Sequence, residues 1–324
     1  MALRRRYASH LSAEARQALS ALRGNLPPLA ARNPLTRNLG RRLWHADWAA
    51  TFSQIDFPYT LEDASIAGAP CVRYVTSANE PVATILYVHG GAFIAGSARV
   101  NATAVLPICK LGPCAGVGVD YSLAPESAFP SQLDEIERVY SVLRANEGPI
   151  VLVGDSAGGA LALSSVHRWR RKGIPLPAGI VLLSPLTDAR AASDTHLSLK
   201  GQDPFFGSTS LNGVLTIFDL YAGGRDFNDP EISPIAGDFA GFPPMLVYVG
   251  SREVLLGDSA RLVEKARRAG VDATLAVVDG LFHLFHMHWS LAETKAAHAD
   301  IAAFVRRIAG KMRDAAEFGP NRAW

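Results

Sequence analysis

The sequence predicts an α/β fold built on a mostly parallel, doubly wound β-sheet. From about residue 54 onward, short and nearly continuous apolar runs alternate with segments of helical periodicity. Strands that are apolar at every position are buried on both faces, as in a parallel sheet covered by helices. Ligands of such sheets bind beyond the carboxyl ends of the strands, so we expect functional residues directly after them.

Seven strands and five helices are expected in this part of the chain. The expected strands are 71–75, 82–88, 115–121, 150–154, 179–184, 245–250 and 274–278. The expected helices are 99–111, 131–145, 156–172, 258–270 and 290–312.

Two segments depart from this alternation. Residues 1–52 have helical patterns, a Pro-rich break at 26–34 and no strand pattern, with Trp44 and Trp48 one helical turn apart. Residues 187–242 contain many turn residues and no convincing strand, and could form an insertion over the ligand end of the sheet. A catalytic domain of residues 53–186 and 243–324 is therefore expected.

Composition and charge narrow the function classes. The 32 Lys and Arg residues nearly balance 30 Asp and Glu residues, for a formal net charge of +2. This balance argues against nucleic acid or an anionic membrane as the main partner. Because no apolar run is long enough to span a membrane and no signal core follows the basic start, we expect a cytoplasmic protein without stable membrane association. The three cysteines have no metal-ligand or CxxC spacing.

The stretch IVLVGDSAGGALAL predicts a nucleophilic serine, Ser156, between a strand and a helix. Small residues two positions on either side of the serine allow a sharp strand-to-helix turn, which exposes the hydroxyl at the helix N-terminus. The alternative is a glycine-rich turn with a helix-capping serine. In this context we favour the nucleophile.

Two further stretches carry groups that suit acyl transfer. LYVHGGAFIAG places glycines directly after a strand, where the amides of Gly90 and Gly91, with that of Ala157, could bind an oxyanion. An ordinary Gly-Gly turn is the alternative. DGLFHLFHMHW follows the last expected strand, and its first histidine, His283, could act as a general base. The histidines that follow it lack metal-ligand spacing and are expected to be structural.

Two carboxylates lie close together in VYVGSREVLLGDSARL. Glu253 lies three residues beyond Gly250 in the loop after a strand, whereas Asp258 lies where the next helix begins and could be a cap or a helix-dipole partner. Asp279, near the His283 loop, is a weaker candidate for the same role. The loop position favours Glu253 as the acid that orients His283.

The order of HGGAF, DYSLAPESAFP, GDSAGG, the acid loop and FH resembles the hormone-sensitive-lipase-like group of α/β hydrolases. The resemblance covers about residues 52–307. It implies an α/β-hydrolase fold with an eight-stranded sheet and a helical cap made of residues 1–52 and 187–242. It also implies hydrolysis of carboxylic esters by Ser156, Glu253 and His283 without a cofactor. Two departures are Ala92, where many relatives have a third glycine, and EVL in place of DPL.

The resemblance and the residues together predict supporting and pocket residues. Asp120 and Glu126 follow an apolar strand and are expected in a buried polar network that braces the catalytic loops. Aromatic side chains could line an apolar substrate pocket, although aromatics at helical spacing are more often simple packing: Trp44, Trp48, Phe52, Phe93, Phe205 and Phe206.

The predicted function is an esterase for short to medium acyl chains, because so much cap over the site disfavours long triglycerides. A lactone hydrolase or a small-molecule deacetylase with the same triad is the alternative. A non-catalytic receptor of the same fold is a more remote one, disfavoured because serine, acid and histidine are all present. The expected partner is a small-molecule ester, and the resemblance suggests a homodimer through the edge of the last strand.

Overall fold

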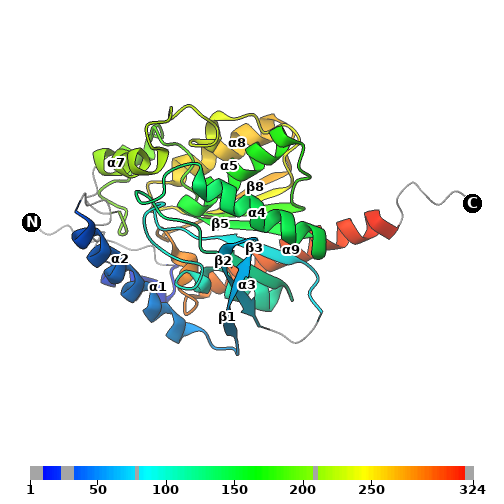
Figure 1. The fold of residues 1–324 in the computed structure, drawn as a ribbon. Coiled ribbons are helices and arrows are strands. Elements are labelled where there is room, and N and C mark those ends of the chain that lie inside the picture. Colours follow the sequence, from blue (N-terminus) through cyan, green and yellow to red (C-terminus); the bar gives the residue numbers. More distant parts are fainter. Residues whose placement is uncertain (1–9, 23–32, 77–79, 207–210, 318–324) are drawn as a thin grey trace, which may run out of the picture.

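The computed structural model describes residues 10–22, 33–76, 80–206 and 211–317, and its centre is one eight-stranded sheet (Figure 1). The strand order is β1-β2-β4-β3-β5-β6-β7-β8, in which β2 pairs antiparallel with β1 and β4 and all other neighbours are parallel. The strands are β1 (Thr60–Ile66), β2 (Ala69–Val75), β3 (Thr84–Val88), β4 (Ala115–Val119), β5 (Ile150–Asp155), β6 (Gly179–Leu183), β7 (Met245–Gly250) and β8 (Ala273–Val278). The predicted fold class is confirmed.

Helices cover both faces of the sheet, as the doubly wound arrangement requires. Figure 1 shows α4, α5 and α8 on one side of the strands and α3 and α9 on the other. The α-helices are α1 (Ala13–Ala21), α2 (Pro34–Ala49), α3 (Leu106–Leu111), α4 (Ser131–Asn146), α5 (Ala157–Lys172), α6 (Thr195–Ser198), α7 (Leu211–Ala222), α8 (Leu256–Arg268) and α9 (Ala292–Glu317). Four short 3-10 helices are η1 (Ala50–Gln54), η2 (Ala102–Ala104), η3 (Pro234–Ala236) and η4 (Phe285–Met287).

Two secondary-structure predictions are corrected. β1 was not expected, because it is an edge strand whose residues are mostly exposed or half-buried and so form no apolar run. The single helix expected over 99–111 is instead η2 followed by α3, with Val105 between them in a non-helical conformation. Pro107 in the first turn of α3 lacks an amide hydrogen and therefore suits a helix start better than a helix interior.

The central strands explain why the sheet was recognisable. Every residue of β3, β5, β6 and β7 is buried, so these strands are apolar on both faces. β8 is the last strand at one edge, and Val277 on it keeps 45% of its surface exposed. The homodimer expected along this edge stays a prediction.

Residues from both predicted cap segments lie at one end of the molecule (Figure 1). The described part of 187–242 contains α6, α7 and η3 and no strand, as expected. Ion pairs from Arg37 and Arg41 of α2 to Glu126 hold the N-terminal segment to the sheet domain. The cap assignment itself stays a prediction, and most of the expected Pro-rich break at 26–34 lies outside the described residues. Among the described helices, none is long and apolar enough to cross a membrane.

Three histidines lie at the C-terminal end of the fold: His286 in η4 and His298 in α9 are fully buried, and His288 beside η4 is half-buried. Burial lowers the pKa of His288 and His298 to about 4 and also lowers that of His286. In the unfolded chain a histidine has a pKa of about 6.5, so the unfolded state binds more protons as the pH falls from 6.5 toward 4. The stability contributed by these neutral rings is therefore lost in that window.

We expect the free energy of unfolding to fall between pH 7 and pH 5, and His298→Leu to reduce this fall. The parent should lose about 1 to 2 kcal/mol more than the variant over this interval, because the variant has one buried imidazole fewer to protonate. Urea denaturation at the two pH values measures the difference.

Leu35→Ala is the control, since Leu35 is 80% exposed and the substitution removes no titratable group, so it should leave the pH dependence unchanged. Asp155, whose pKa burial raises to about 6, contributes equally to all three proteins and cancels in the comparison. An equal fall in the parent and in His298→Leu would contradict the prediction.

Candidate active site

Ser156 stands in the sharp turn between β5 and α5. Its backbone has φ of 50° and ψ of −118°, a region that non-glycine residues rarely adopt. The turn is close-packed, because a Cβ on Gly158 would lie 2.0 Å from the carbonyl oxygen of Val88 and one on Gly154 2.5 Å from that of Gly158. Only glycine fits these two positions, which explains the small residues on either side of the serine.

Ser156, His283 and Glu253 lie in one chain of hydrogen bonds. The Oγ of Ser156 is 3.0 Å from Nε2 of His283, and Nδ1 of His283 is 2.7 Å from Oε2 of Glu253. The side chains come from the loops after β5, β8 and β7, at the carboxyl ends of parallel strands. All three residues are at most 6% exposed. The structure therefore brings together the three residues that the sequence singled out.

The two rival carboxylates do not contact His283. Asp258 is fully buried in the first turn of α8, where it accepts a hydrogen bond from the Thr187 amide and lies 3.2 Å from Nε2 of His196. It is not the N-cap of α8, a position that Leu255 occupies, so the expected cap role is corrected. Asp279 is largely exposed, and its carboxylate contacts Ser251 and His10.

Glu253 is fixed by donors to its other oxygen. The hydroxyl of Ser184 and the amide of Gly250 both donate to Oε1, at 2.8 and 2.6 Å. Oε2 is thereby left to face His283. A buried carboxylate needs such donors, since burial without them disfavours the charged form.

The loop after β3 carries the two glycines whose amides were expected as oxyanion donors, and one of these amides is engaged by another residue. The Gly90 amide donates to Oδ1 of Asp155 at 2.7 Å, so Gly90 is not available as a donor. The amides of Gly91, Ala92 and Ala157 donate to no other described residue. Gly91 has φ of +121°, and a Cβ there would lie 2.1 Å from the Ala95 carbonyl oxygen. The amides that no described residue engages are therefore those of Gly91, Ala92 and Ala157, with Ala92 in place of the expected Gly90.

The two expected supporting acids have different surroundings. Asp120 accepts a hydrogen bond from the Ala98 amide, and the neighbouring Tyr121 donates to the His89 carbonyl oxygen at 2.7 Å, which braces the loop after β3. Glu126 is not buried: its side chain is 49% exposed and pairs with Arg37 and Arg41 of α2. Hydrogen bonds, first of all from Arg41, lower the pKa of Glu126 to about 2. Glu126 therefore ties α2 to the sheet domain.

Aromatic side chains from both predicted cap segments meet over His283. The rings of Phe205 and Phe206 each have their centroid 4.9 Å from that of His283. Phe205 also contacts Trp44 and Trp48 of α2 at 6.0 and 6.1 Å. Phe93 and Phe52, which were also expected in the pocket, have their ring contacts with other residues.

Phe93 is fully buried and stacks on Tyr221 of α7 at 4.1 Å, and Phe52 packs against Tyr59 at 6.2 Å. These two rings contribute to packing between segments rather than to the group over His283. Of the six aromatic candidates, Phe205 and Phe206 contact His283 directly, and Trp44 and Trp48 contact Phe205.

The histidines after His283 make no metal site with other described residues. His288 is half-buried, as expected of a structural histidine, whereas His286 is fully buried and so more enclosed than expected. In the described part of the chain, no group of three or more His, Cys, Asp or Glu residues could hold a metal ion.

Residues 85–287, more than half of the chain, match the family of proteins with the alpha/beta hydrolase fold. The chain belongs to the α/β-hydrolase family. The match spans the sheet from β3 to β8 and includes Ser156, Glu253 and His283.

Curated relatives of this hydrolase are ester-cleaving enzymes. An acetyl-hydrolase of Streptomyces hygroscopicus is 31% identical over 253 residues, which are 77% of this chain and 84% of the relative. An esterase of Acinetobacter venetianus is 34% identical over 232 residues, which are 69% of this chain and 75% of the relative.

Solved structures agree with this assignment. An esterase from the bacterial hormone-sensitive lipase family superposes with a TM-score of 0.82 at 33% identity, covering 91% of this chain and 99% of that chain. An esterase/lipase from an uncultured bacterium has a TM-score of 0.81 at 28% identity, covering 92% and 99%. This hydrolase is accordingly an ester-hydrolysing enzyme that resembles the hormone-sensitive lipase group.

Sequence reasoning missed four residues that hold the site: Asp155, Ser184, Asp203 and Arg41. Asp155 lies inside the GDSAGG stretch, and Ser184 ends an expected strand. Both positions are at the carboxyl end of a strand, where functional residues were expected, so the sequence could have indicated them. Asp203 and Arg41 lie in the two predicted cap segments, which have no strand pattern to place them near the site. Their contacts are visible only in three dimensions.

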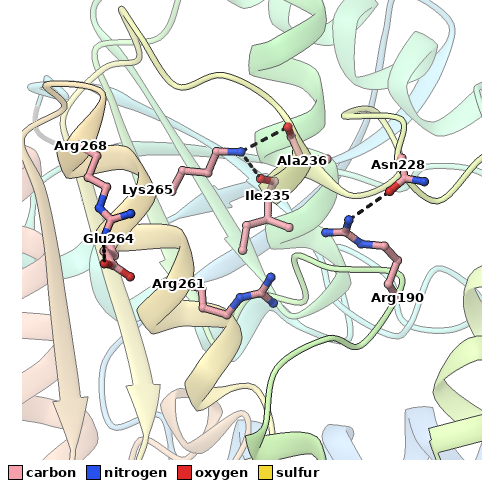
Figure 2. A pocket seen from close by; sticks show the side chains of 8 residues that line it. All are labelled: Arg190, Asn228, Ile235, Ala236, Arg261, Glu264, Lys265 and Arg268. Carbon is pink, nitrogen blue, oxygen red and sulfur yellow. Dashed lines mark hydrogen bonds and ion pairs between the residues drawn. The ribbon is translucent and has the colours of Figure 1, made fainter.

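A separate hollow of about 730 Å³ lies beside α8 and is lined by basic side chains (Figure 2). Arg190 and Arg261 there both pair with the buried Asp188, Arg268 pairs with Glu264, and Lys265 donates to two backbone carbonyls. No predicted site residue lines the hollow. The basic side chains of the hollow thus pair largely with other residues of the protein. The hollow is distinct from the site around Ser156.

We expect Gly158→Ala to destabilise this hydrolase by about 1 to 3 kcal/mol, because the added methyl group overlaps the Val88 carbonyl and the overpacked turn must shift. Chemical denaturation measures the loss. Gly148→Ala is the matched control, since a Cβ at Gly148 meets nothing within 4 Å. Equal stability of the two variants would contradict the tight-turn interpretation.

Proposed function

We propose that this protein is a serine carboxylesterase that acts through Ser156, His283 and Glu253. The hydrogen-bonded chain from Ser156 Oγ through His283 to Glu253, with 3.0 and 2.7 Å links, is the observation that carries the proposal. A histidine between a hydroxyl and a carboxylate can take the hydroxyl proton while the carboxylate stabilises the resulting imidazolium.

The reaction proceeds in two steps on the same groups. Ser156 attacks the acyl carbon while His283 takes the hydroxyl proton, and His283 then gives that proton to the leaving alcohol. The amides of Gly91, Ala92 and Ala157 stabilise the negative charge on the carbonyl oxygen. His283 then takes a proton from water, whose oxygen attacks the acyl carbon of the acyl-serine. As the bond to Ser156 Oγ breaks, His283 returns the proton to Oγ and the acid is released.

The acyl group that fits is proposed to be short to medium in length. Phe205 and Phe206 lie against His283, and Trp44 and Trp48 pack on Phe205, so the space above the serine is walled by aromatic rings. The acetyl-hydrolase among the relatives supports a small acyl group. For the same reason, deacetylation of a small molecule is the second candidate.

Ser156→Ala and Glu253→Gln should each lower kcat for a p-nitrophenyl ester by roughly 10⁴-fold, because the first removes the nucleophile and the second removes the charge that stabilises the imidazolium. Steady-state kinetics measure the loss, and circular dichroism checks that both variants are folded. The parent should also release a burst of p-nitrophenol as the acyl-enzyme forms. Turnover retained in folded Ser156→Ala would refute the proposal.

Asp258→Asn is the matched acid control for Glu253→Gln. Asp258 is equally buried but contacts Thr187 and His196, so its amide variant should cost about 1 to 3 kcal/mol of stability and leave kcat nearly unchanged. If Asp258→Asn loses turnover and Glu253→Gln does not, the assignment of the acid is wrong.

A series of p-nitrophenyl esters from acetate to palmitate tests the acyl preference. We expect kcat/KM to be highest for chains of two to about eight carbons and to fall steeply beyond them, since a longer chain meets the aromatic wall. Phe206→Ala should extend the accepted length, whereas Phe52→Ala should not, because Phe52 packs against Tyr59. A maximum at palmitate in the parent would overturn the proposed acyl range.

A further inference from the structure

Asp203, in the segment between β6 and β7, makes contacts with both sides of the site. Its Oδ2 accepts a hydrogen bond from the amide of Val254 at 2.8 Å. Its Oδ1 accepts from the amides of Phe205 and Phe206 at 2.8 and 2.9 Å. One carboxylate therefore holds the residue after Glu253 and the two aromatic residues that lie against His283.

The environment of Asp203 makes these contacts strong. The residue is fully buried, and a buried carboxylate is costly unless donors satisfy its oxygens. Burial raises the pKa of Asp203, His283 and the Val254 amide lower it, and Glu253 raises it again. The titratable groups whose charges affect the pKa of Asp203 are thus His283 and Glu253, the proposed base and acid.

The main-chain geometry explains what the contacts position. Glu253 directly precedes Val254, so fixing the Val254 amide fixes the peptide unit from which the Glu253 side chain leaves. The turn that Asp203 makes over its next residues orients Phe205 and Phe206 toward His283.

We propose that Asp203 is a positioning residue that locks Glu253 and the Phe205–Phe206 pair together, so that the pair closes over His283 only when the acid is aligned. The inference rests on the proposed function and deepens it. Asp203 does not touch the reacting atoms, and it acts through Glu253 and the aromatic pair.

Asp203→Asn tests the proposal, because an amide has one acceptor oxygen where the carboxylate has two. At least one of the Val254 and Phe205 amides then loses its acceptor. We expect kcat for p-nitrophenyl acetate to fall roughly 10- to 100-fold with little change in KM, since small misplacements of a catalytic group cost about this much. We also expect the acid-limb pKa of kcat/KM to fall, because a less constrained Glu253 stabilises the His283 imidazolium less.

Asp203→Ser is the second variant if Asp203→Asn does not fold. A serine hydroxyl can still accept from the turn amides but is too short to reach Val254 as well, so the same fall in kcat and in the acid-limb pKa is expected. Asp188→Asn is the matched control, because Asp188 is an equally buried acid of the same segment that pairs instead with Arg190 and Arg261. It should lose stability and keep both kinetic values.

The outcomes separate this inference from the proposed function. If the parent hydrolyses no ester and shows no burst, the proposed function fails. If the parent is active and a folded Asp203 variant keeps its kcat and its acid limb, the positioning role alone fails. A fall in kcat without a shift of the acid limb, or an equal fall in Asp188→Asn, would show general destabilisation and would also overturn it.

Discussion

The close contact between the turn after β5 and the end of β3 is the constraint on which the site depends. Gly158 packs against the Val88 carbonyl, and Ser156 in the same turn has a positive φ. The same contact places the Ala157 amide opposite the loop that carries Gly91, because that loop begins directly after Val88. Backbone strain at one residue thus sets the distance between the proposed nucleophile and the proposed oxyanion donors.

The parts of the fold that follow from local chemistry could be predicted from sequence. The buried central strands are continuous apolar runs, and Ser156 and Glu253 each follow such a run. His283 follows β8, an edge strand that is mostly half-buried but whose sequence ATLAVV is still largely apolar. Since parallel strands end at one edge of the sheet, residues far apart in sequence could be expected together there. β1 could not be recognised in this way, because an exposed edge strand has no apolar run to detect.

Other features of the site depend on contacts that no local pattern carries. Gly90 and Gly91 look alike in the sequence, yet only the Gly90 amide is engaged by Asp155, which itself has no expected role. The position of Glu126 after a strand predicts a buried supporting acid. Its partners are instead two arginines of α2, about ninety residues earlier in the chain. Asp203 lies in a segment without regular strands, so its link to the loop after β7 could be found only from the packed structure.

The aromatic group next to His283 comes from two segments of the chain, and neither segment contributes a residue to the proposed triad. Trp44 and Trp48 come from α2, which ion pairs to the half-exposed Glu126 hold in place, whereas Phe205 comes from the segment between β6 and β7. Selection can therefore remodel the wall that meets the acyl group through changes in α2 while Ser156, His283 and Glu253 stay as they are. In evolutionary terms, the residues that would select the substrate and the residues that would cleave it can therefore change independently of each other.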